Sequence, residues 1–527
     1  MDTKTIQGIE SMTSKNLTTT KPMKVALAAI RTRIRFTDIG VLIWLALAVF
    51  TLHMLTNGQY GFHRDELEMI DNAHHLDWGF VDYPPLTPFV ARVALELFGP
   101  SLVGVRLFAA LAQSIAMVLA GLMTRELGGS RFAQIVTVLA VAIAPIALAG
   151  GAFLTYSNFD YLWWVLIAYL MIRLLKSEDP RWWLGIGAAF GLGMLTKYTI
   201  LVLAAGVAIG VVLTRLRRYL SSPWLWAGVA LALLIFLPNL IWQMQHDFIS
   251  LEFLRFIHAR DIRIGRTAGF LPEQLIFSTS PIALPLWIAG LVYYFFIPAG
   301  KRYRALGWTY LVPLVLLYAL KGRSYYLAPA YPMLIAAGAV AWEKWLGGLS
   351  IRKPGLVRGI TLSALAVGAV GSAIVALPIA PVNSGLWRFT SQVHDLFVEQ
   401  IGWPELVETV AGIYNSLPAE DQRQAGILTG NYGEAGAINL FGPAYGLPKA
   451  ISGVNSYWLR GYGDPSPEVL IVLDWRPSSA FETCELVGRV TNHYGVRNEE
   501  TSHPDIFLCR RLTRPWAEFW KNLRSFG

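Results

Sequence analysis

Residues 61–99 read GFHRDELEMIDNAHHLDWGFVDYPPLTPFVARVALELFG, a stretch that combines many acids with two helical patterns. In its first half Leu67, Ile70 and His74 recur at helical spacing. In its second half, residues 86–98 are apolar but carry two opposite charges one helical turn apart. This second segment is too short and too charged to cross a bilayer. We therefore expect two interfacial helices on a membrane surface, joined by a turn at the proline pair.

The rest of the chain has the composition of a membrane protein. Its 527 residues are 54% hydrophobic and only 15% charged, with a mean hydropathy of +0.45, whereas soluble chains carry about 25% charge. A single soluble globule is therefore excluded. Runs of about 20 apolar residues are long enough to cross ~30 Å of hydrocarbon. The sequence predicts about eleven helical spans, near residues 39–57, 101–123, 132–150, 159–175, 182–196, 198–214, 222–243, 275–298, 305–320, 327–346 and 357–378.

The positive charge of the chain is explained by its position between these spans. The formal net charge is +9, and cytoplasmic loops of membrane proteins are enriched in Lys and Arg. One orientation places every basic cluster in the cytoplasm, so no nucleic-acid partner is needed to explain the charge. It makes residues 1–36 a cytoplasmic tail. The transmembrane module, residues 37–378, then presents the loops 58–100 and 244–274 to the outside, together with residues 379–527.

The composition changes after residue 379. A helical pattern at 403–416 accompanies β-like runs at 425–429, 468–473 and 505–509. These features predict a small α/β domain outside the membrane.

Two motifs in this outer domain have a structural interpretation. Cys484 and Cys509 are the only cysteines of the chain, and their even number and oxidising location predict a disulfide, the alternative being two small buried side chains. The glycine-rich stretch 430–436 follows a β-like run, but its spacing differs from the dinucleotide-binding fingerprint. A tight strand-to-helix turn is expected there.

Candidate catalytic acids lie where helices begin at the outer surface. Asp65 and Glu66 open the first interfacial helix, and Asp160 lies at the entrance of a predicted span. The free N–H groups of a helix start stabilise an acid, so each of these residues is either a functional carboxylate or an ordinary N-terminal cap.

Cations on the outer face supply the complementary half of a site, because positive charge is rare there. They either extend toward lipid headgroups or form a pocket for a phosphate held at the bilayer surface. Acids beside phosphate-binding cations indicate transfer from a lipid phosphate. The candidates are Arg64, Arg106, Lys197, Arg260, Arg263, and Lys321 with Arg323, which precede Tyr325 and Tyr326.

A metal cofactor is a weaker hypothesis. His63, His74 and His75 lie near carboxylates and could bind a divalent metal, but their spacing matches no zinc signature. No other cofactor is indicated.

Several motifs together resemble one family. Besides residues 61–99, they are VRLFAAL at 105–111, TRELGGSRFAQ at 124–134, GLGMLTKYTILVL at 191–203, FLPNLIWQMQHDF at 236–248, ALGWTYL at 305–311, YYLAPAYP at 325–332, GNYGEAGAINLFG at 430–442 and ISGVNSYW at 451–458. The chain resembles the bacterial protein O-mannosyltransferase-like branch of the C-type glycosyltransferases, which are related to the lipid A aminoarabinose transferase.

The resemblance implies the C-type fold and an inverting transferase in the bacterial cytoplasmic membrane. Its donor would be a polyprenyl-phosphate sugar on the outer, periplasmic face, and its acceptor a glycolipid, polysaccharide or protein of the envelope. The family acids correspond to Asp65, with Glu66, and less directly to Asp160. Asp65 would be the general base. The family often has a basic or polar residue before the proline pair, whereas this chain has Asp82-Tyr83 there. The first loop is therefore a poorer candidate for a phosphate contact, and Lys321 with Tyr325 or Tyr326 becomes the better phosphate site.

Two other classes of protein remain as alternatives. A transporter or flippase of lipid-linked precursors also needs many spans and cations near a headgroup, but it usually shows repeated halves and charges at the membrane midplane. A receptor or anchor would leave the acidic first loop unexplained. Release of polyprenyl phosphate distinguishes the transferase from both.

Overall fold

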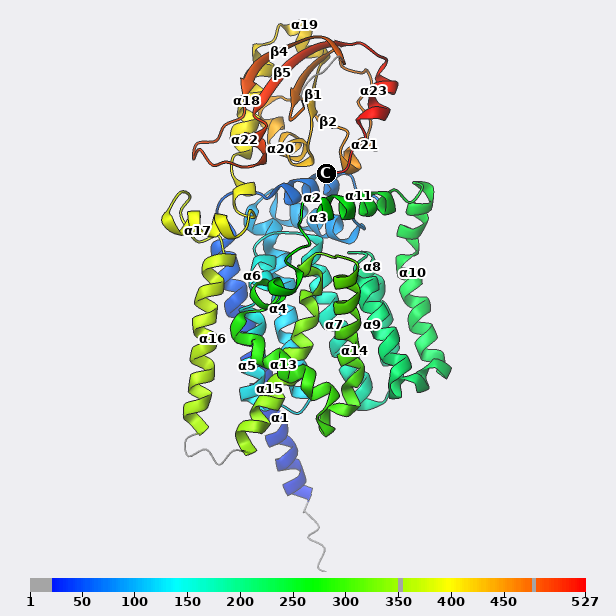
Figure 1. The fold of residues 1–527 in the computed structure, drawn as a ribbon, viewed down its shortest axis with the longest axis vertical. Coiled ribbons are helices and arrows are strands. Elements are labelled where there is room, and N and C mark those ends of the chain that lie inside the picture. The colour runs from blue at the N-terminus through cyan, green and yellow to red at the C-terminus, as the bar shows by residue number, and fades with distance from the viewer. Residues whose placement is uncertain (1–20, 349–353, 476–479) are drawn as a thin grey trace, which may run out of the picture.

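The computed structural model describes residues 21–348, 354–475 and 480–527. Figure 1 shows an upright helical bundle with a small sheet domain above it, and helices that lie across the molecule between the two. These crossing helices include α2 (Arg64–His74), α3 (Leu86–Phe98) and α11 (Ile249–Arg263). The two interfacial helices predicted in the first loop therefore exist, and α3 has the predicted bounds.

The bundle helices coincide with the predicted spans, each of which overlaps a helix or a bent helix pair. They are α1 (Lys21–Thr56), α4 (Leu102–Glu126), α5 (Arg131–Ala142), α6 (Pro145–Gly151), α7 (Tyr156–Ser177), α8 (Trp182–Met194), α9 (Ile200–Leu213), α10 (Pro223–Gln245), α12 (Phe270–Glu273), α13 (Leu284–Phe295), α14 (Arg304–Ala319), α15 (Tyr331–Gly348) and α16 (Pro354–Ala376). By length and composition, five helices of the described chain can cross a membrane, or up to eight if each bent pair is one span. The chain is a multi-pass membrane protein, and the number eleven stays a prediction.

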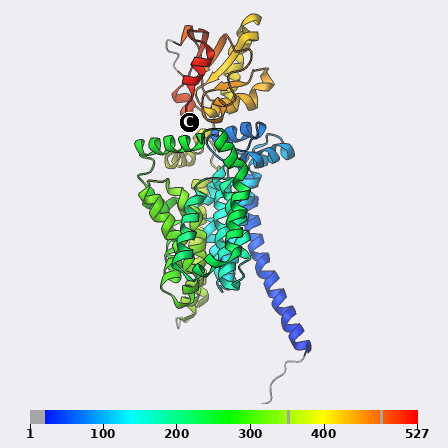
Figure 2. The ribbon, with the colours of Figure 1, turned by 90° about the vertical axis from the view of Figure 1, so that its right-hand side faces the viewer.

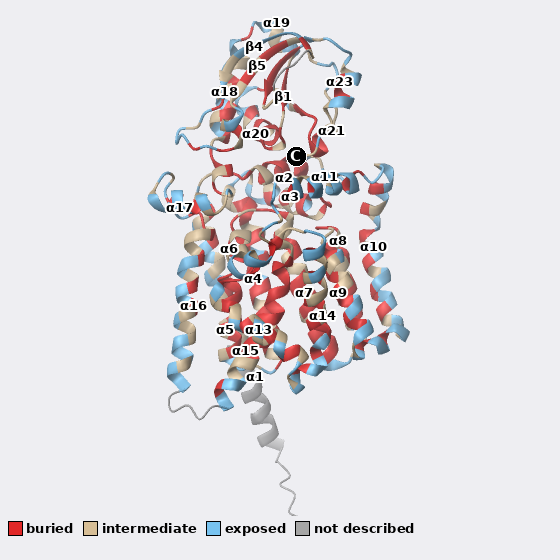
Figure 3. Ribbon diagram, in the orientation of Figure 1, coloured by how far each residue is buried: buried red, intermediate tan, exposed pale blue. Residues whose placement is uncertain are grey.

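The bundle buries its centre and exposes apolar side chains on its outer helices. Figure 3 shows buried residues concentrated in α4, α7 and α15, whereas α10 and α16 are largely exposed. Leu234 of α10 and Val367 of α16 are 64% and 68% exposed, as expected for side chains that face lipid.

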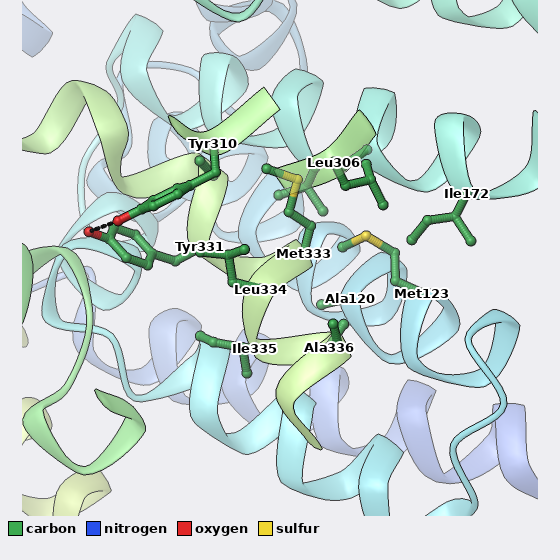
Figure 4. Packing of buried hydrophobic residues seen from close by; sticks show 14 of the residues in the cluster. Ala120, Met123, Ile172, Leu306, Tyr310, Tyr331, Met333, Leu334, Ile335 and Ala336 are labelled. Carbon is green, nitrogen blue, oxygen red and sulfur yellow. Dashed lines mark hydrogen bonds between the residues drawn. The ribbon is translucent and has the colours of Figure 1, made fainter. Parts of the chain in front are cut away.

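Close packing of α13 against α15 forms part of this centre. A Cβ added to Gly290 or Gly338 would collide with a backbone carbonyl of the facing helix, so only glycine permits this approach. In Figure 4, Met333 of α15 lies among Met123, Ile172 and Leu306 of three other helices. The bundle is thus a tightly packed scaffold for the loops above it.

The outer domain is an α/β sandwich around a five-stranded sheet of order β2-β1-β3-β5-β4. Strands β2, β1 and β3 are parallel, and β5 runs antiparallel to β3 and β4. One face packs against α18 and α20, and the other against α23. The bounds are β1 (Ala425–Thr429), β2 (Ala450–Ser452), β3 (Val469–Leu473), β4 (Phe481–Arg489), β5 (Asp505–Leu512), α17 (Gly385–Val393), α18 (Trp403–Ser416), α19 (Ala419–Gln424), α20 (Tyr432–Phe441), α21 (Asn455–Trp458), α22 (Glu499–Ser502) and α23 (Trp516–Leu523).

Sequence patterns anticipated part of this domain. The predicted helix 403–416 is α18, and the three β-like runs are β1, β3 and β5. The glycine-rich stretch forms the expected turn from β1 into α20. A disulfide joins Cys484 of β4 to Cys509 of β5.

The outer domain is packed directly on the first loop through α20 and α2, which the views of Figures 1 and 2 both place at the domain boundary. A Cβ on Gly436 would lie 2.8 Å from the Leu67 side chain, and one on Gly433 would lie 2.8 Å from Arg64. These two glycines therefore let α20 approach the helix that carries Asp65.

Candidate active site

The start of α2 presents Asp65 at the boundary between bundle and outer domain. His63 caps the helix, because its Nδ1 accepts a hydrogen bond from the backbone N–H of Asp65 at 3.1 Å. The Asp65 carboxylate accepts a 2.9 Å hydrogen bond from the hydroxyl of Tyr432, at the start of α20. Its side chain remains 38% exposed. Asp65 is thus held in place and still accessible, as a general base must be.

Electrostatics keep Asp65 ionised. Burial alone would raise the pKa of its carboxyl, but His63, Arg64 and the Tyr432 hydroxyl outweigh burial and hold the pKa below its ordinary value. Arg323 contributes in the same direction. The carboxylate is therefore charged at neutral pH.

A second acid pair lies one helical turn along α2. Glu68 accepts a 3.1 Å hydrogen bond from Asn455 of α21 and lies beside Asp82. Burial raises the pKa of Glu68 to about 7, and burial together with Glu68 raises the pKa of Asp82 well above its usual range. The pair consequently retains a proton at neutral pH, which limits the negative charge close to Asp65.

Glu66 is held in a buried network that indicates a structural role, and its predicted catalytic role stays a prediction. Its carboxylate receives two hydrogen bonds from Arg106, at 2.9 and 2.6 Å, and others from the backbone N–H groups of His63 and Leu154. Both charged side chains are fully buried. Arg106 also donates to the carbonyls of Asn57 and Gly61. Its donors are directed to protein acceptors, so this geometry does not support the expected phosphate contact.

Arg64 also points away from a phosphate. Its guanidinium forms ion pairs with Glu499 and, at 4.0 Å, with Glu399, and it lies 5.5 Å from the centre of the Tyr432 ring. Arg64 therefore fastens α2 to the outer domain. The expectation that it binds the donor phosphate is not supported by this geometry.

Lys197 is the centre of an aromatic-walled cation site. Its ammonium lies 4.3 Å from the ring centre of Tyr326, and 4.9 Å from those of Tyr325 and Tyr156. It donates one hydrogen bond, to Ser157 at 3.0 Å. The side chain is only 8% exposed. Three of the predicted phosphate-binding residues, Lys197, Tyr325 and Tyr326, are thus brought together.

Two arginines extend this cluster toward Asp261 of α11. Arg323 donates to Asp261 of α11 at 2.5 Å and to the Tyr325 hydroxyl at 3.4 Å. Arg260 of α11 lies 3.9 Å from Asp261, and its buried Nε has no hydrogen-bond partner among the described residues. The sequence pointed to Arg323 only as a neighbour of Lys321, although its position two residues before Tyr325 was the available signal.

Lys321 and Arg263 lie outside the cluster. Both side chains are exposed, and neither contacts the residues around Lys197 within the described chain. Lys321 adopts a positive φ of 51° at the end of the connection from α14, which directs the chain so that Arg323 rather than Lys321 enters the site. The geometry therefore favours Arg323, and it does not support the expectation that Lys321 grips a phosphate.

Asp160 belongs to the floor beneath this cluster rather than to the neighbourhood of a base. It is 3% exposed and accepts hydrogen bonds from Trp164 and Thr199, each at 3.2 Å. Burial lowers the pKa of Lys197, whereas Tyr325 and Asp160 oppose that change. Asp160 therefore helps to keep Lys197 charged, which is a positioning role, and its predicted catalytic role stays a prediction.

The histidines do not assemble a metal centre. Across residues 21–348, 354–475 and 480–527, no group of three His, Cys, Asp or Glu side chains could hold a metal ion. His63 is engaged as a helix cap, His74 is exposed, and the Nδ1 of His75 is 2.9 Å from the Asp71 carbonyl.

Comparison with known proteins confirms the resemblance noted in the sequence. Residues 82–242 match the family model of dolichyl-phosphate-mannose-protein mannosyltransferases. The lipid A galacturonosyltransferase RgtD of Rhizobium johnstonii is 29% identical over 229 residues, which are 42% of this chain and 46% of RgtD. The undecaprenyl phosphate-α-4-amino-4-deoxy-L-arabinose arabinosyl transferase 1 of Pseudomonas fluorescens is 28% identical over 211 residues, or 38% of this chain and 36% of that protein. The chain thus matches about half, or less, of the length of these relatives.

Solved structures confirm the fold class. ArnT from Cupriavidus metallidurans bound to undecaprenyl phosphate superposes with a TM-score of 0.54 at 17% identity, over 89% of this chain and 97% of ArnT. The oligosaccharyltransferase of Archaeoglobus fulgidus superposes with a TM-score of 0.52 at 12% identity, over 82% of this chain and 67% of its own. The chain has the C-type glycosyltransferase fold.

Proposed function

We propose that this protein is an inverting glycosyltransferase that moves a sugar from a polyprenyl-phosphate donor to an envelope acceptor. The observation that carries the proposal is the proximity of an ionised, accessible Asp65 to the cation site of Lys197, Arg323 and Arg260. Arg323 is close enough to Asp65 to lower its pKa, and it contacts Tyr325 beside Lys197. One relative is named as a lipid A galacturonosyltransferase, and another as an arabinosyl transferase of an undecaprenyl-phosphate sugar, which supports the proposal.

The acid side of the site would activate the acceptor. Asp65 takes the proton of an acceptor hydroxyl, whose oxygen then attacks the anomeric carbon of the sugar. The bond between that carbon and the phosphate oxygen breaks on the opposite face, so the configuration at the carbon inverts. Tyr432 holds the carboxylate toward the acceptor, and the low pKa of Asp65 ensures that it is free of a proton beforehand.

The cation side would stabilise the leaving group. A phosphodiester that carries one negative charge leaves as a phosphate monoester of higher charge, so fixed cations bind the transition state more tightly than the ground state. Lys197 lies at the centre of this cluster, and Arg260 has an unsatisfied N–H to offer. Tyr325 and Tyr326 supply hydroxyls beside it.

The site faces one end of the bundle, next to the outer domain. In the orientation favoured by the basic loops, that end is the periplasmic side of the bacterial cytoplasmic membrane, where polyprenyl-phosphate sugars and glycolipid acceptors would meet. A glycolipid is the acceptor class that the relatives favour, since one is named for lipid A.

Release of polyprenyl phosphate by the purified protein tests the proposal. Incubation with a synthetic polyprenyl-phosphate sugar and an extract of envelope glycolipids should release polyprenyl phosphate, detected by mass spectrometry. Asp65→Asn keeps the shape of the side chain and should lower turnover by 10²–10⁴, the range typical of a lost general base. Residual turnover within about tenfold of the parent, or direct use of a nucleotide sugar, would contradict the mechanism. Movement of the lipid without its cleavage would support a flippase instead.

A further inference from the structure

The outer domain contains a cavity of about 430 Å³ at the carboxyl ends of its three parallel strands. Thr429 and Gly430 end β1, Gly453 and Val454 follow β2, and Asp474 follows β3. Helix α23 closes the cavity on the other side with Phe519 and Asn522. Figure 1 shows α23 beside this part of the sheet. The cavity is formed by different residues from those around Asp65 and Lys197.

The location is one at which open parallel sheets bind ligands. Strand β1 is flanked by β2 on one side and β3 on the other, so the chain leaves neighbouring strands in different directions at their carboxyl ends. A crevice opens at such a point, and ligands of α/β domains bind there. Its volume is within the range of small-molecule sites.

Leu428 of β1 and Phe519 of α23 form the apolar part of the wall, since both belong to the hydrophobic cluster between the sheet and α23. Thr429 follows Leu428, so its buried hydroxyl lies on the other face of the strand, toward α18 and α20, and is not directed into the cavity.

The remaining walls indicate the chemistry of that ligand. Trp475 lies 5.7 Å from Phe519 and 5.9 Å from Phe481, between ring centres, and forms an aromatic wall. Asp474 and Asn522 offer acceptors and donors for hydroxyl groups. The cavity is also lined by Arg514 and Arg524, which form ion pairs with Glu518 and Glu252. A phosphate or carboxylate would compete with these two acids for the guanidinium groups. A sugar ring with an anionic substituent combines all three requirements.

The two segments that line the cavity after β1 and β2 also lead into contacts with α2, the helix that carries Asp65. Two residues after Gly430, the Tyr432 hydroxyl contacts Asp65 at 2.9 Å. Directly after Val454, the side chain of Asn455 contacts Glu68 at 3.1 Å. From this geometry we propose that the cavity binds an anionic saccharide of the acceptor, a role that rests on the proposed transferase function.

Binding of small saccharides to the full-length protein in nanodiscs tests this assignment. Ligand-observed NMR would compare N-acetylglucosamine 6-phosphate with N-acetylglucosamine and with inorganic phosphate. The phosphorylated sugar should bind more tightly than either fragment. Trp475→Ala should weaken its binding by roughly tenfold or more. Arg514→Glu, at an exposed position, should weaken binding of the phosphorylated sugar and leave the neutral sugar unchanged.

A control and a second readout separate this inference from the proposed function. Tyr494→Ala removes an exposed aromatic ring of the same domain that does not line the cavity, and should bind like the parent. Slow hydrolysis of the donor by water should persist in Trp475→Ala and be lost in Asp65→Asn. Parental affinity in both Trp475→Ala and Arg514→Glu, or no binding by the parent at millimolar probe, overturns the cavity assignment. Failure of the parent to cleave any donor overturns the transferase function and with it the acceptor role, whereas saccharide binding by the cavity is judged by the NMR measurement.

Discussion

The hydroxyl of Tyr432 donates a 2.9 Å hydrogen bond to the carboxylate of Asp65, which lies 367 residues earlier in the chain. The outer domain thereby contributes directly to the environment of the candidate base. The first loop, residues 58–100, therefore does not form the surroundings of Asp65 by itself.

Tyr432→Phe should therefore alter the pH dependence of turnover. The hydrogen bond favours the ionised form of Asp65, so its loss raises the pKa of the carboxyl, and the base becomes protonated at a higher pH. Turnover should fall about tenfold, most strongly on the acidic side, and the acidic limb of kcat/KM should move upward in pH. Tyr494→Phe, at an exposed position of the same domain, is the control. An unchanged acidic limb would argue against this contact.

Lys197 and Lys321 offer a matched pair for the phosphate site. Lys197→Gln removes the cation enclosed by three tyrosine rings and should lower turnover by about 10²-fold, as expected when a charge-stabilising donor is lost. Lys321→Gln changes an exposed side chain and should remain within about twofold of the parent. Steady-state kinetics with a synthetic polyprenyl-phosphate sugar would check both. Equal effects of the two substitutions would refute the distinction.

Glu66→Gln should damage folding rather than chemistry. It leaves Arg106 buried without its counter-charge, which typically costs about 3–5 kcal/mol. Glu96→Gln breaks the exposed pair of Arg92 and Glu96 and should cost less than about 1 kcal/mol. Thermal unfolding of the purified proteins would compare them. A stable Glu66→Gln protein without turnover would restore Glu66 to the reaction.

Glu500 predicts a pH effect on stability. It is 3% exposed, and burial together with Glu399 raises its pKa to about 7. Because the folded pKa is higher than the unfolded value, stability is fully present below about pH 4.5 and declines as the pH rises through 7. Glu500→Gln cannot ionise, so it should gain up to about 3 kcal/mol at pH 8 and little at pH 5. Tm values at both pH values would show this.

The neighbouring residue supplies the control for that experiment. Glu499 forms an ion pair with Arg64, so Glu499→Gln should bring no gain at pH 8. A gain of similar size in both variants would mean that general charge reduction, rather than burial of Glu500, sets the pH dependence.

Elements with strong local patterns could be predicted from the sequence, and contacts between distant residues could not. Helices α3 and α18 follow from their apolar spacing, and β1 from a short apolar run. Strand β2 has only three residues, and β4 exposes most of its side chains, so neither produces a clear pattern. The disulfide partners needed only a count of cysteines.

The candidate site shows the same division. Asp65 was accessible to sequence reasoning because an acid at a helix start is a local feature. Whether Arg106 faces a phosphate or Glu66 depends on how α4 packs against α2, and no local spacing encodes that arrangement. The sequence around Tyr432 predicts only a strand-to-helix turn, because nothing near this residue indicates a partner in the first loop.

The contact of α20 with α2 has a consequence for biosynthesis. Ribosomes release the N-terminal loop long before residue 432 is made, so Asp65 waits without its partner while the remaining helices insert. The contacts of Asp65 are completed only after α20 has been made and has packed on α2 through Gly433 and Gly436. Chains that stop before residue 432 consequently lack the hydrogen bond that holds the Asp65 carboxylate.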